Sequence, residues 1–181
     1  MTSPVASAVS FPRSLRRLRR DRRGSAAVEF ALVAPVFFAL LFAILETGIM
    51  FLAGQVLQTV AQQSARMILT GQAQTASYTP PQFANYVCSQ VPALFNCNNI
   101  SIDVESYPSF SAVALGNPID NNGNFISTNL KYSPGGPGDI VMVRLFYQWP
   151  LFVTGLGWNP SNLAGNKRLL VGTAAFKNEP Y

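Results

Sequence analysis

A run of sixteen uncharged residues, FALVAPVFFALLFAIL (30–45), constrains this chain more than any other sequence feature. The run lies between Glu29 and Glu46, and the apolar composition continues to Ala53. A helix needs about 20 apolar residues to cross the hydrocarbon core of a bilayer, so residues 30–53 predict a transmembrane helix. The apolar part of a secretory signal is shorter, about 7–15 residues, and ends at a small-residue cleavage site. No such site falls cleanly here, and we therefore expect a helix that stays in the membrane.

The positive charge is concentrated ahead of this run. Residues 1–24 carry seven arginines and one acid, Asp21, whereas residues 25–181 carry six basic and seven acidic side chains. This asymmetry predicts an N-terminus in the cytoplasm and a C-terminal part on the periplasmic side of a bacterial inner membrane. A twin-arginine export signal is the less favoured alternative. The arginines are Arg13, Arg16, Arg17, Arg19, Arg20, Arg22 and Arg23.

The composition excludes several classes of function. A short basic tail is not a basic folded surface, so we expect no nucleic-acid binding. The chain has no histidine, which excludes Ser-His and Cys-His catalysis and any histidine-ligated metal. It also lacks a G-x-S-x-G motif, so a hydrolase using Ser or Asp is disfavoured. The segment 117–124 (NPIDNNGN) fits a turn better than a calcium loop, since its glycine is misplaced and no later glutamate completes the loop. We expect no enzyme activity, no catalytic residue, no cofactor and no metal site.

The helical pattern continues beyond the apolar run. In residues 55–70 a stripe of apolar and small side chains recurs at helical spacing, with glutamines and Arg66 on the other positions. Gly71 follows where a terminating glycine is expected. One helix from Ser25 to Thr70 is therefore predicted, bent at Pro35. The stripe consists of Leu57, Val60, Ala61, Ser64, Ala65 and Ile68.

The remaining residues, 72–181, predict a small domain. After a polar linker, Pro80-Pro81 can open a short helix. Residues 100–107 (ISIDVESY) alternate apolar and polar side chains, as a half-buried strand does, and 139–151 and 167–177 predict two further strands. A long helix followed by three or four antiparallel strands is an α+β fold, with the 55–70 stripe covering one face of the sheet. The aromatic stretch 149–158 (WPLFVTGLGW) is interpreted first as core, with the membrane face or a partner contact as alternatives.

The two cysteines, Cys88 and Cys97, are nine positions apart. In an oxidising periplasm they predict a disulfide. Two separate thiols or a Cys-ligated metal are the alternatives, and two ligands without histidine make a poor zinc site.

The order of residues around Gly24 carries a family resemblance. In RRDRRG-SAAVEFALVAP a basic run ends in glycine, a small residue follows, and Glu29 is fifth when Ser25 is counted first. This resembles the processing site of type IV prepilins, and residues 23–71 as a whole are similar to the TadE-like family, the minor pilins or pseudopilins of the tight-adherence (Flp) pilus. The ending TAAFKNEPY is loosely similar as well. Ser25 stands where the major pilins commonly have phenylalanine, which favours a minor pilin.

The resemblance implies cleavage between Gly24 and Ser25 by a prepilin peptidase. Cleavage would free an α-amino group one helical turn from Glu29, and pairing of these opposite charges in a low dielectric would offset their desolvation and set the register between subunits. Glu46 is interpreted first as solvated at the far membrane interface, with a specific contact as the alternative. The predicted parts are a cytoplasmic leader (1–24), a long helix (25–71) and a periplasmic domain (72–181).

The implied function is structural. The chain would act in biogenesis of an adhesive pilus, with the membrane, the prepilin peptidase, other minor pilins and the pilus platform or filament as partners. The alternative is a signal-anchored inner-membrane protein whose periplasmic domain binds a ligand or partner unrelated to pili.

Overall fold

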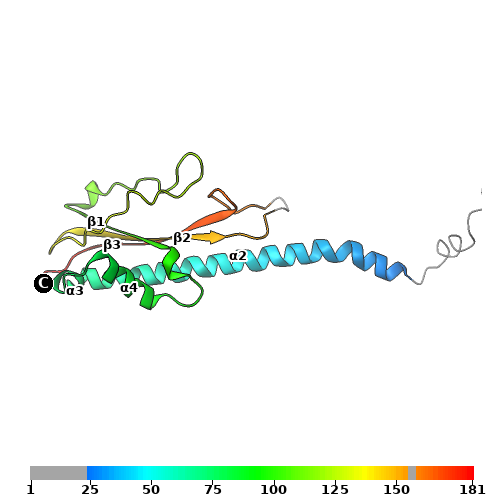
Figure 1. Ribbon diagram of the computed structural model, residues 1–181, viewed down its shortest axis with the longest axis horizontal. Coiled ribbons are helices and arrows are strands. Elements are labelled where there is room, and N and C mark those ends of the chain that lie inside the picture. The colour runs from blue at the N-terminus through cyan, green and yellow to red at the C-terminus, as the bar shows by residue number, and fades with distance from the viewer. Residues whose placement is uncertain (1–23, 155–157) are drawn as a thin grey trace, which may run out of the picture. The chain divides into compact units, whose positions relative to one another are not determined.

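The computed structural model describes residues 24–154 and 158–181, and it confirms the predicted α+β class (Figure 1). The chain divides into two compact units, residues 1–41 and 42–181, which are described separately below. The helices are α2 (Ser25–Leu69), α3 (Gln72–Thr75) and α4 (Pro80–Gln90), with short 3-10 turns η1 (Cys97–Asn99) and η2 (Phe110–Ala112). The strands β1 (Ile100–Tyr107), β2 (Ile140–Pro150) and β3 (Lys167–Lys177) form an antiparallel sheet in the order β1-β2-β3.

Helix α2 begins at Ser25, as predicted, and ends one residue before the predicted Thr70. Gly71 has the left-handed backbone (φ 73°) that favours glycine, and its N–H bonds to the carbonyl of Ile68 at 3.0 Å. The free carbonyl of Leu69 accepts the N–H of Glu179 at 3.0 Å. The last turn of α2 is thus closed by its own C′ glycine and by the C-terminal segment.

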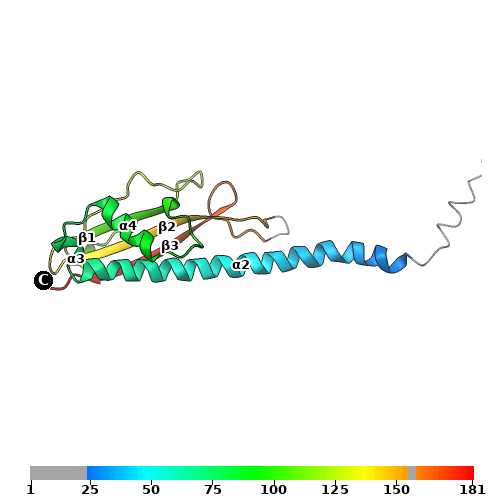
Figure 2. The ribbon, with the colours of Figure 1, turned by 60° about the horizontal axis from the view of Figure 1, so that its bottom comes forward.

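The main core of the second unit lies between one face of the sheet and helices α2 and α4 (Figure 2). The predicted stripe is confirmed, because every one of its six residues is buried, together with Ala53 and Met50, one and two turns before Leu57. From α4, Phe83 and Val87 complete this layer. Sheet residues that point toward it include Val104, Val143 and Leu145.

The helix comes unusually close to the edge strand β3. A Cβ at Gly172 would lie 2.5 Å from the carbonyl oxygen of Leu57 and 3.1 Å from Cβ of Ala61, so glycine is required for this approach. The next residue of the helix after Leu57, Gln58, donates its side-chain N–H to the Thr173 carbonyl (2.7 Å), and its side-chain oxygen accepts the Thr173 N–H (2.9 Å). Backbone packing and a paired amide together fix α2 on β3.

The other face of the sheet is covered by the long connection between β1 and β2. Phe146, Leu163 and Leu169 form a second small core there, with Ile119 and Phe125 packed against it. The predicted turn at 117–124 is confirmed: Oδ1 of Asp120 accepts the N–H groups of Asn122 (2.9 Å) and Asn124 (2.7 Å). These hydrogen bonds lower the pKa of Asp120, and the backbone hydrogen bond from Asn124 has the largest effect.

This cover changes the environment of β1. The alternating pattern gave β1 one apolar and one polar side, and Val104 does face the main core. Asp103, on the polar side, is nevertheless completely buried. The expectation of a solvated polar side is wrong at this residue, because the segment around Lys131 lies over it and donates a backbone N–H to its carboxylate at 2.8 Å.

Candidate functional site

The sequence motif lies at an exposed helix start. Gly24 is exposed, and its carbonyl accepts the N–H of Val28 at 3.1 Å, so the glycine directly precedes the first turn of α2. Among the described residues, apart from its chain neighbour, no heavy atom lies within 4 Å of the position that a Cβ at Gly24 would occupy. The Gly24–Ser25 peptide bond is therefore accessible in the described chain. The seven arginines lie outside the described residues.

Glu29 follows Ser25 at the i, i+4 spacing that places two residues on the same face of a helix. Its side chain is exposed, and among the described residues it has neither a hydrogen-bond nor an ion-pair partner. The predicted processing and register residues, Gly24, Ser25 and Glu29, thus lie within two turns of one another along α2.

Large apolar side chains are exposed along α2 after Glu29. An 18-residue window of this helix has a mean hydropathy of 2.5, and none of the window is buried within the chain. In the part of the chain that the structure describes, α2 is the helix long and apolar enough to cross a membrane. Exposed apolar surface of this extent indicates membrane anchoring. The exposed residues include Phe30, Leu32, Val33, Val36, Phe37, Leu40, Phe42, Ile44 and Leu45.

Glu46 makes a specific contact, which is the less favoured of its two interpretations. Its two carboxylate oxygens accept backbone N–H groups from the segment after β2: Oε1 accepts that of Phe152, and Oε2 that of Val153 at 3.0 Å. The expectation of simple interfacial solvation is therefore wrong. The contact bridges residues more than one hundred positions apart in the sequence, which no local pattern reveals.

The surroundings of Glu46 are apolar. A pocket of about 430 Å³ beside it is lined by α2 and by the end of β2 with the following segment. Trp149 also contacts the main core, whereas Phe152 has 85% of its surface exposed and Trp158 has 56%. Core packing, the first interpretation of 149–158, therefore holds for Trp149 and is wrong for Phe152 and Trp158. The lining residues are Phe42, Leu45, Glu46, Ile49, Trp149, Pro150, Phe152 and Val153.

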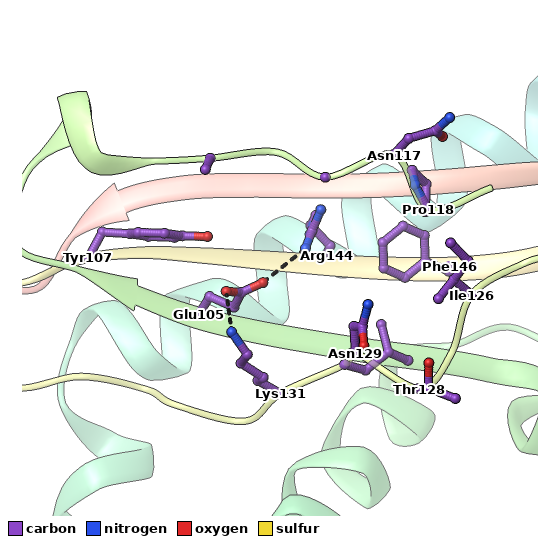
Figure 3. Close-up of a pocket in the computed structure, with 13 residues that line it drawn as sticks. Glu105, Tyr107, Asn117, Pro118, Ile126, Thr128, Asn129, Lys131, Arg144 and Phe146 are labelled. Atoms are coloured by element: carbon purple, nitrogen blue, oxygen red, sulfur yellow. Dashed lines mark hydrogen bonds and ion pairs between the residues drawn. The ribbon is translucent and has the colours of Figure 1, made fainter. Parts of the chain in front are cut away.

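A charged cluster lies on the loop-covered face of the sheet. Arg144 of β2 faces Asp103 of β1 in the strand register. It donates to Oδ2 of Asp103 from Nε (2.9 Å) and Nη2 (2.5 Å), and Nη2 also contacts Oε1 of Glu105 at 3.1 Å. Nζ of Lys131 lies 3.3 Å from the other Glu105 oxygen (Figure 3). The Arg144 guanidinium stacks over the Phe146 ring, 5.5 Å from its centroid.

These contacts set the protonation of the cluster. Burial alone raises the pKa of Glu105, but the hydrogen bond and positive charge of Lys131, helped by Tyr107 and Arg144, outweigh it and hold the pKa below the usual 4.5. Burial, and then the negative charge of Glu105, raise the pKa of Tyr107 above 10.0. Glu105 is therefore ionised at neutral pH, and the ion pairs of Asp103 and Glu105 with Arg144 and Lys131 have the arrangement of a structural ion-pair network.

The pocket beside this cluster has a volume of about 680 Å³ and opens under the β1–β2 connection. Asn117, Thr128 and Asn129 add neutral polar groups to its wall, as Figure 3 shows. Arg144 and Lys131 are already paired with carboxylates, so neither offers an uncompensated charge to a ligand. Within residues 24–154 and 158–181, no three Asp, Glu, Cys or His side chains gather where a metal ion could bind.

Cys88 at the end of α4 and Cys97 at the start of η1 are joined by a disulfide, with their Cα atoms 5.6 Å apart. The nine-residue separation closes a loop that contains Phe95, which is buried against Tyr147 and Trp149. The bridge thus lies at the junction of α4 with the sheet. The predicted site residues consequently fall into two groups: Gly24, Ser25 and Glu29 at the start of α2, and the cysteine pair in the folded domain.

Comparison with known proteins finds one family match, and it covers the segment that contains the first group. Residues 24–66 match the family model described as TadE-like protein. The match begins at Gly24 and extends into the buried stripe of α2, and it confirms the resemblance to the TadE-like family. No curated protein and no solved structure matches the chain. The TadE-like family is a structural and assembly family of the tight-adherence pilus, so the match associates this chain with that pilus.

Proposed function

We propose that this chain is a prepilin-like minor pilin, which acts in assembly of a tight-adherence pilus. The observation that carries the proposal is the accessible Gly24–Ser25 bond directly before an exposed apolar helix with Glu29 in its first turns, all inside the TadE-like segment. The leader (1–24) lies in the cytoplasm, residues 30–53 cross the inner membrane, and the domain 72–181 lies in the periplasm. A prepilin peptidase cuts between Gly24 and Ser25.

Cleavage changes the chain physically in two ways. It removes seven arginines and one acid, a positive charge that otherwise holds the N-terminus at the anionic cytoplasmic leaflet. It also creates an α-amino group at Ser25. Because Glu29 has no partner among the described residues, its carboxylate is available to an amine on a neighbouring subunit, and such a pair fixes the axial register of packed helices.

Processing is tested by intact mass and N-terminal sequencing of the full chain, expressed with and without a prepilin peptidase. The expected product begins at Ser25 only when the peptidase is present. Gly24→Leu should block cleavage because a bulky side chain fills the open space at the cut site. Gly48→Leu is the matched control, since Gly48 also has open space around it but lies within the helix. A chain that keeps its arginines under all conditions contradicts the proposal and supports a signal-anchored binding protein.

The role of Glu29 is tested separately. Glu29→Gln retains the size of the side chain and removes its charge, so we expect normal cleavage but loss of co-purification with partner pilins. Glu29→Asp, which retains the charge, should preserve part of the interaction. Normal co-purification of Glu29→Gln would rule out the charge-pair register.

A further inference from the structure

The chain at the end of β2 and just after it is uncharged and lies beside α2, with Phe152 exposed and Leu151 buried. We call Pro150–Val153 the anchor loop. From Pro150 to Trp158 the sequence contains no Asp, Glu, Lys or Arg. Phe152 is 85% exposed although it is a large apolar residue. Folded domains rarely expose contiguous apolar surface to water without a partner.

The position of the anchor loop along α2 indicates what covers it. About 20 apolar residues cross the hydrocarbon core, and counting 20 from Phe30 ends at Ile49. The anchor loop lies beside Phe42, Leu45 and Ile49, which line one pocket with it. These belong to the last two turns of that 20-residue stretch, within the predicted transmembrane segment 30–53. The folded domain begins to bury the helix only at Met50.

The contact with Glu46 makes this position compatible with a lipid environment. An isolated carboxylate is costly in a bilayer, and each unpaired backbone N–H adds a further cost. Here the two carboxylate oxygens accept the N–H groups of Phe152 and Val153. The Glu46 carboxylate therefore has two hydrogen-bond donors, and both backbone N–H groups have an acceptor. The side chains beside this contact are apolar.

We propose that the anchor loop enters the outer leaflet of the membrane as a second contact, with Phe152 among the acyl chains and Glu46 holding the loop to the transmembrane helix. This contact fixes the periplasmic domain against the bilayer surface before assembly. The inference rests on the membrane-anchoring part of the proposed function and is independent of processing or pilus assembly. We favour lipid over a second copy of the chain because the helix residues beside the loop, Phe42, Leu45 and Ile49, are themselves exposed and apolar and belong to the predicted transmembrane segment.

The test uses the full chain with a single tryptophan at the loop. The protein has two tryptophans, so Trp149→Phe and Trp158→Phe provide a tryptophan-free background. Phe152→Trp then reports on the anchor loop. Phe110→Trp is the matched control, because Phe110 is also an exposed aromatic (63%). It follows β1 at the opposite end of the sheet, where Tyr107 pairs with the first residue of β2.

Both variants are placed in phosphatidylethanolamine–phosphatidylglycerol nanodiscs with brominated acyl chains, at one copy per disc. We expect several-fold stronger quenching by the bromolipid at position 152 than at 110, and several-fold weaker quenching by aqueous iodide. Equal iodide quenching at the two positions, without bromolipid quenching, would overturn the proposal. Protection from iodide that appears only at two copies per disc would overturn it too, and would assign the loop to a second subunit.

Substitutions of Glu46 test the holding contact. Glu46→Ala leaves two N–H groups without an acceptor, so the loop should leave the lipid and bromolipid quenching at position 152 should fall several-fold. In Glu46→Gln, which keeps one acceptor oxygen, bromolipid quenching at position 152 should fall less. Unchanged quenching in Glu46→Ala would contradict the role of Glu46. Flotation of the wild-type chain with vesicles is measured in parallel, so that a failure of membrane anchoring is distinguished from a failure of the loop proposal.

Discussion

The buried ion pair between Asp103 and Arg144 permits a quantitative prediction. The Asp103 side chain is 1% exposed and that of Arg144 is 13% exposed. Asp103 accepts two hydrogen bonds from Arg144 and one from the backbone N–H of Lys131. Asp103→Asn retains the shape of the side chain, removes its charge and leaves the guanidinium without its best acceptor.

Removing one member of a buried pair costs about 3–5 kcal/mol, because the remaining charge stays desolvated. Here Arg144 keeps a second carboxylate, Glu105, at 3.1 Å. The expected loss in the free energy of unfolding is therefore at the lower limit, about 3 kcal/mol. For a domain whose total stability is about 5–15 kcal/mol, this is a large fraction.

The measurement is urea unfolding of the full chain in mild detergent, followed by the fluorescence of Trp149 in a Trp158→Phe background. Lys131→Ala is the control: its side chain is 67% exposed, and loss of an exposed pair costs at most about 1 kcal/mol. A loss of less than about 1 kcal/mol for Asp103→Asn would refute the assignment of a buried pair that secures the β1–β2 connection to the sheet.

Three further predictions use the same assay. Gly172→Ala should lower the free energy of unfolding by about 1–3 kcal/mol, because the added Cβ meets the Leu57 carbonyl. Gly54→Ala, in α2 with open space around it, is the control and should be neutral or stabilising. Equal effects of the two substitutions would contradict the close approach. Replacing both cysteines by serine should lower the free energy of unfolding by somewhat less than about 3 kcal/mol. An unchanged urea midpoint would show that the disulfide does not stabilise the domain. Because the pKa of Glu105 is lowered in the folded state, the stability that it contributes is complete well above pH 4.5 and is lost as the pH falls through the folded pKa. Glu105→Gln should flatten this acid dependence, and an unchanged pH profile would assign it to other groups.

The parts of the fold that could be predicted are the helix and strands whose residues repeat at a regular spacing along the sequence. The stripe of α2 repeats at helical spacing, and every predicted member is buried. The third predicted strand, 167–177, coincides with β3. The second predicted strand, 139–151, extends one residue beyond β2 at each end. The order β1-β2-β3 was beyond the sequence, because strand pairing depends on contacts between distant residues.

The parts that could not be predicted depend on such distant partners. Asp103 looks like one polar position in an alternating strand, and only Arg144, forty-one residues later, explains its burial. Glu46 looks like an interfacial acid, and its acceptors are used by backbone groups beyond β2. By contrast, the motif at Gly24, Ser25 and Glu29 could be read from the sequence because it is short and contiguous. Its proposed role still depends on a peptidase and on a neighbouring subunit.

The paired hydrogen bonds between Gln58 and Thr173 have a consequence for self-association. An edge strand offers unpaired backbone groups to which another chain can add in register, and this is a common route to aggregation. At Thr173 the glutamine amide supplies both the donor and the acceptor that an added strand would supply. A foreign strand can therefore continue the sheet past this residue only by first displacing the long helix, which blocks β-augmentation at the centre of β3.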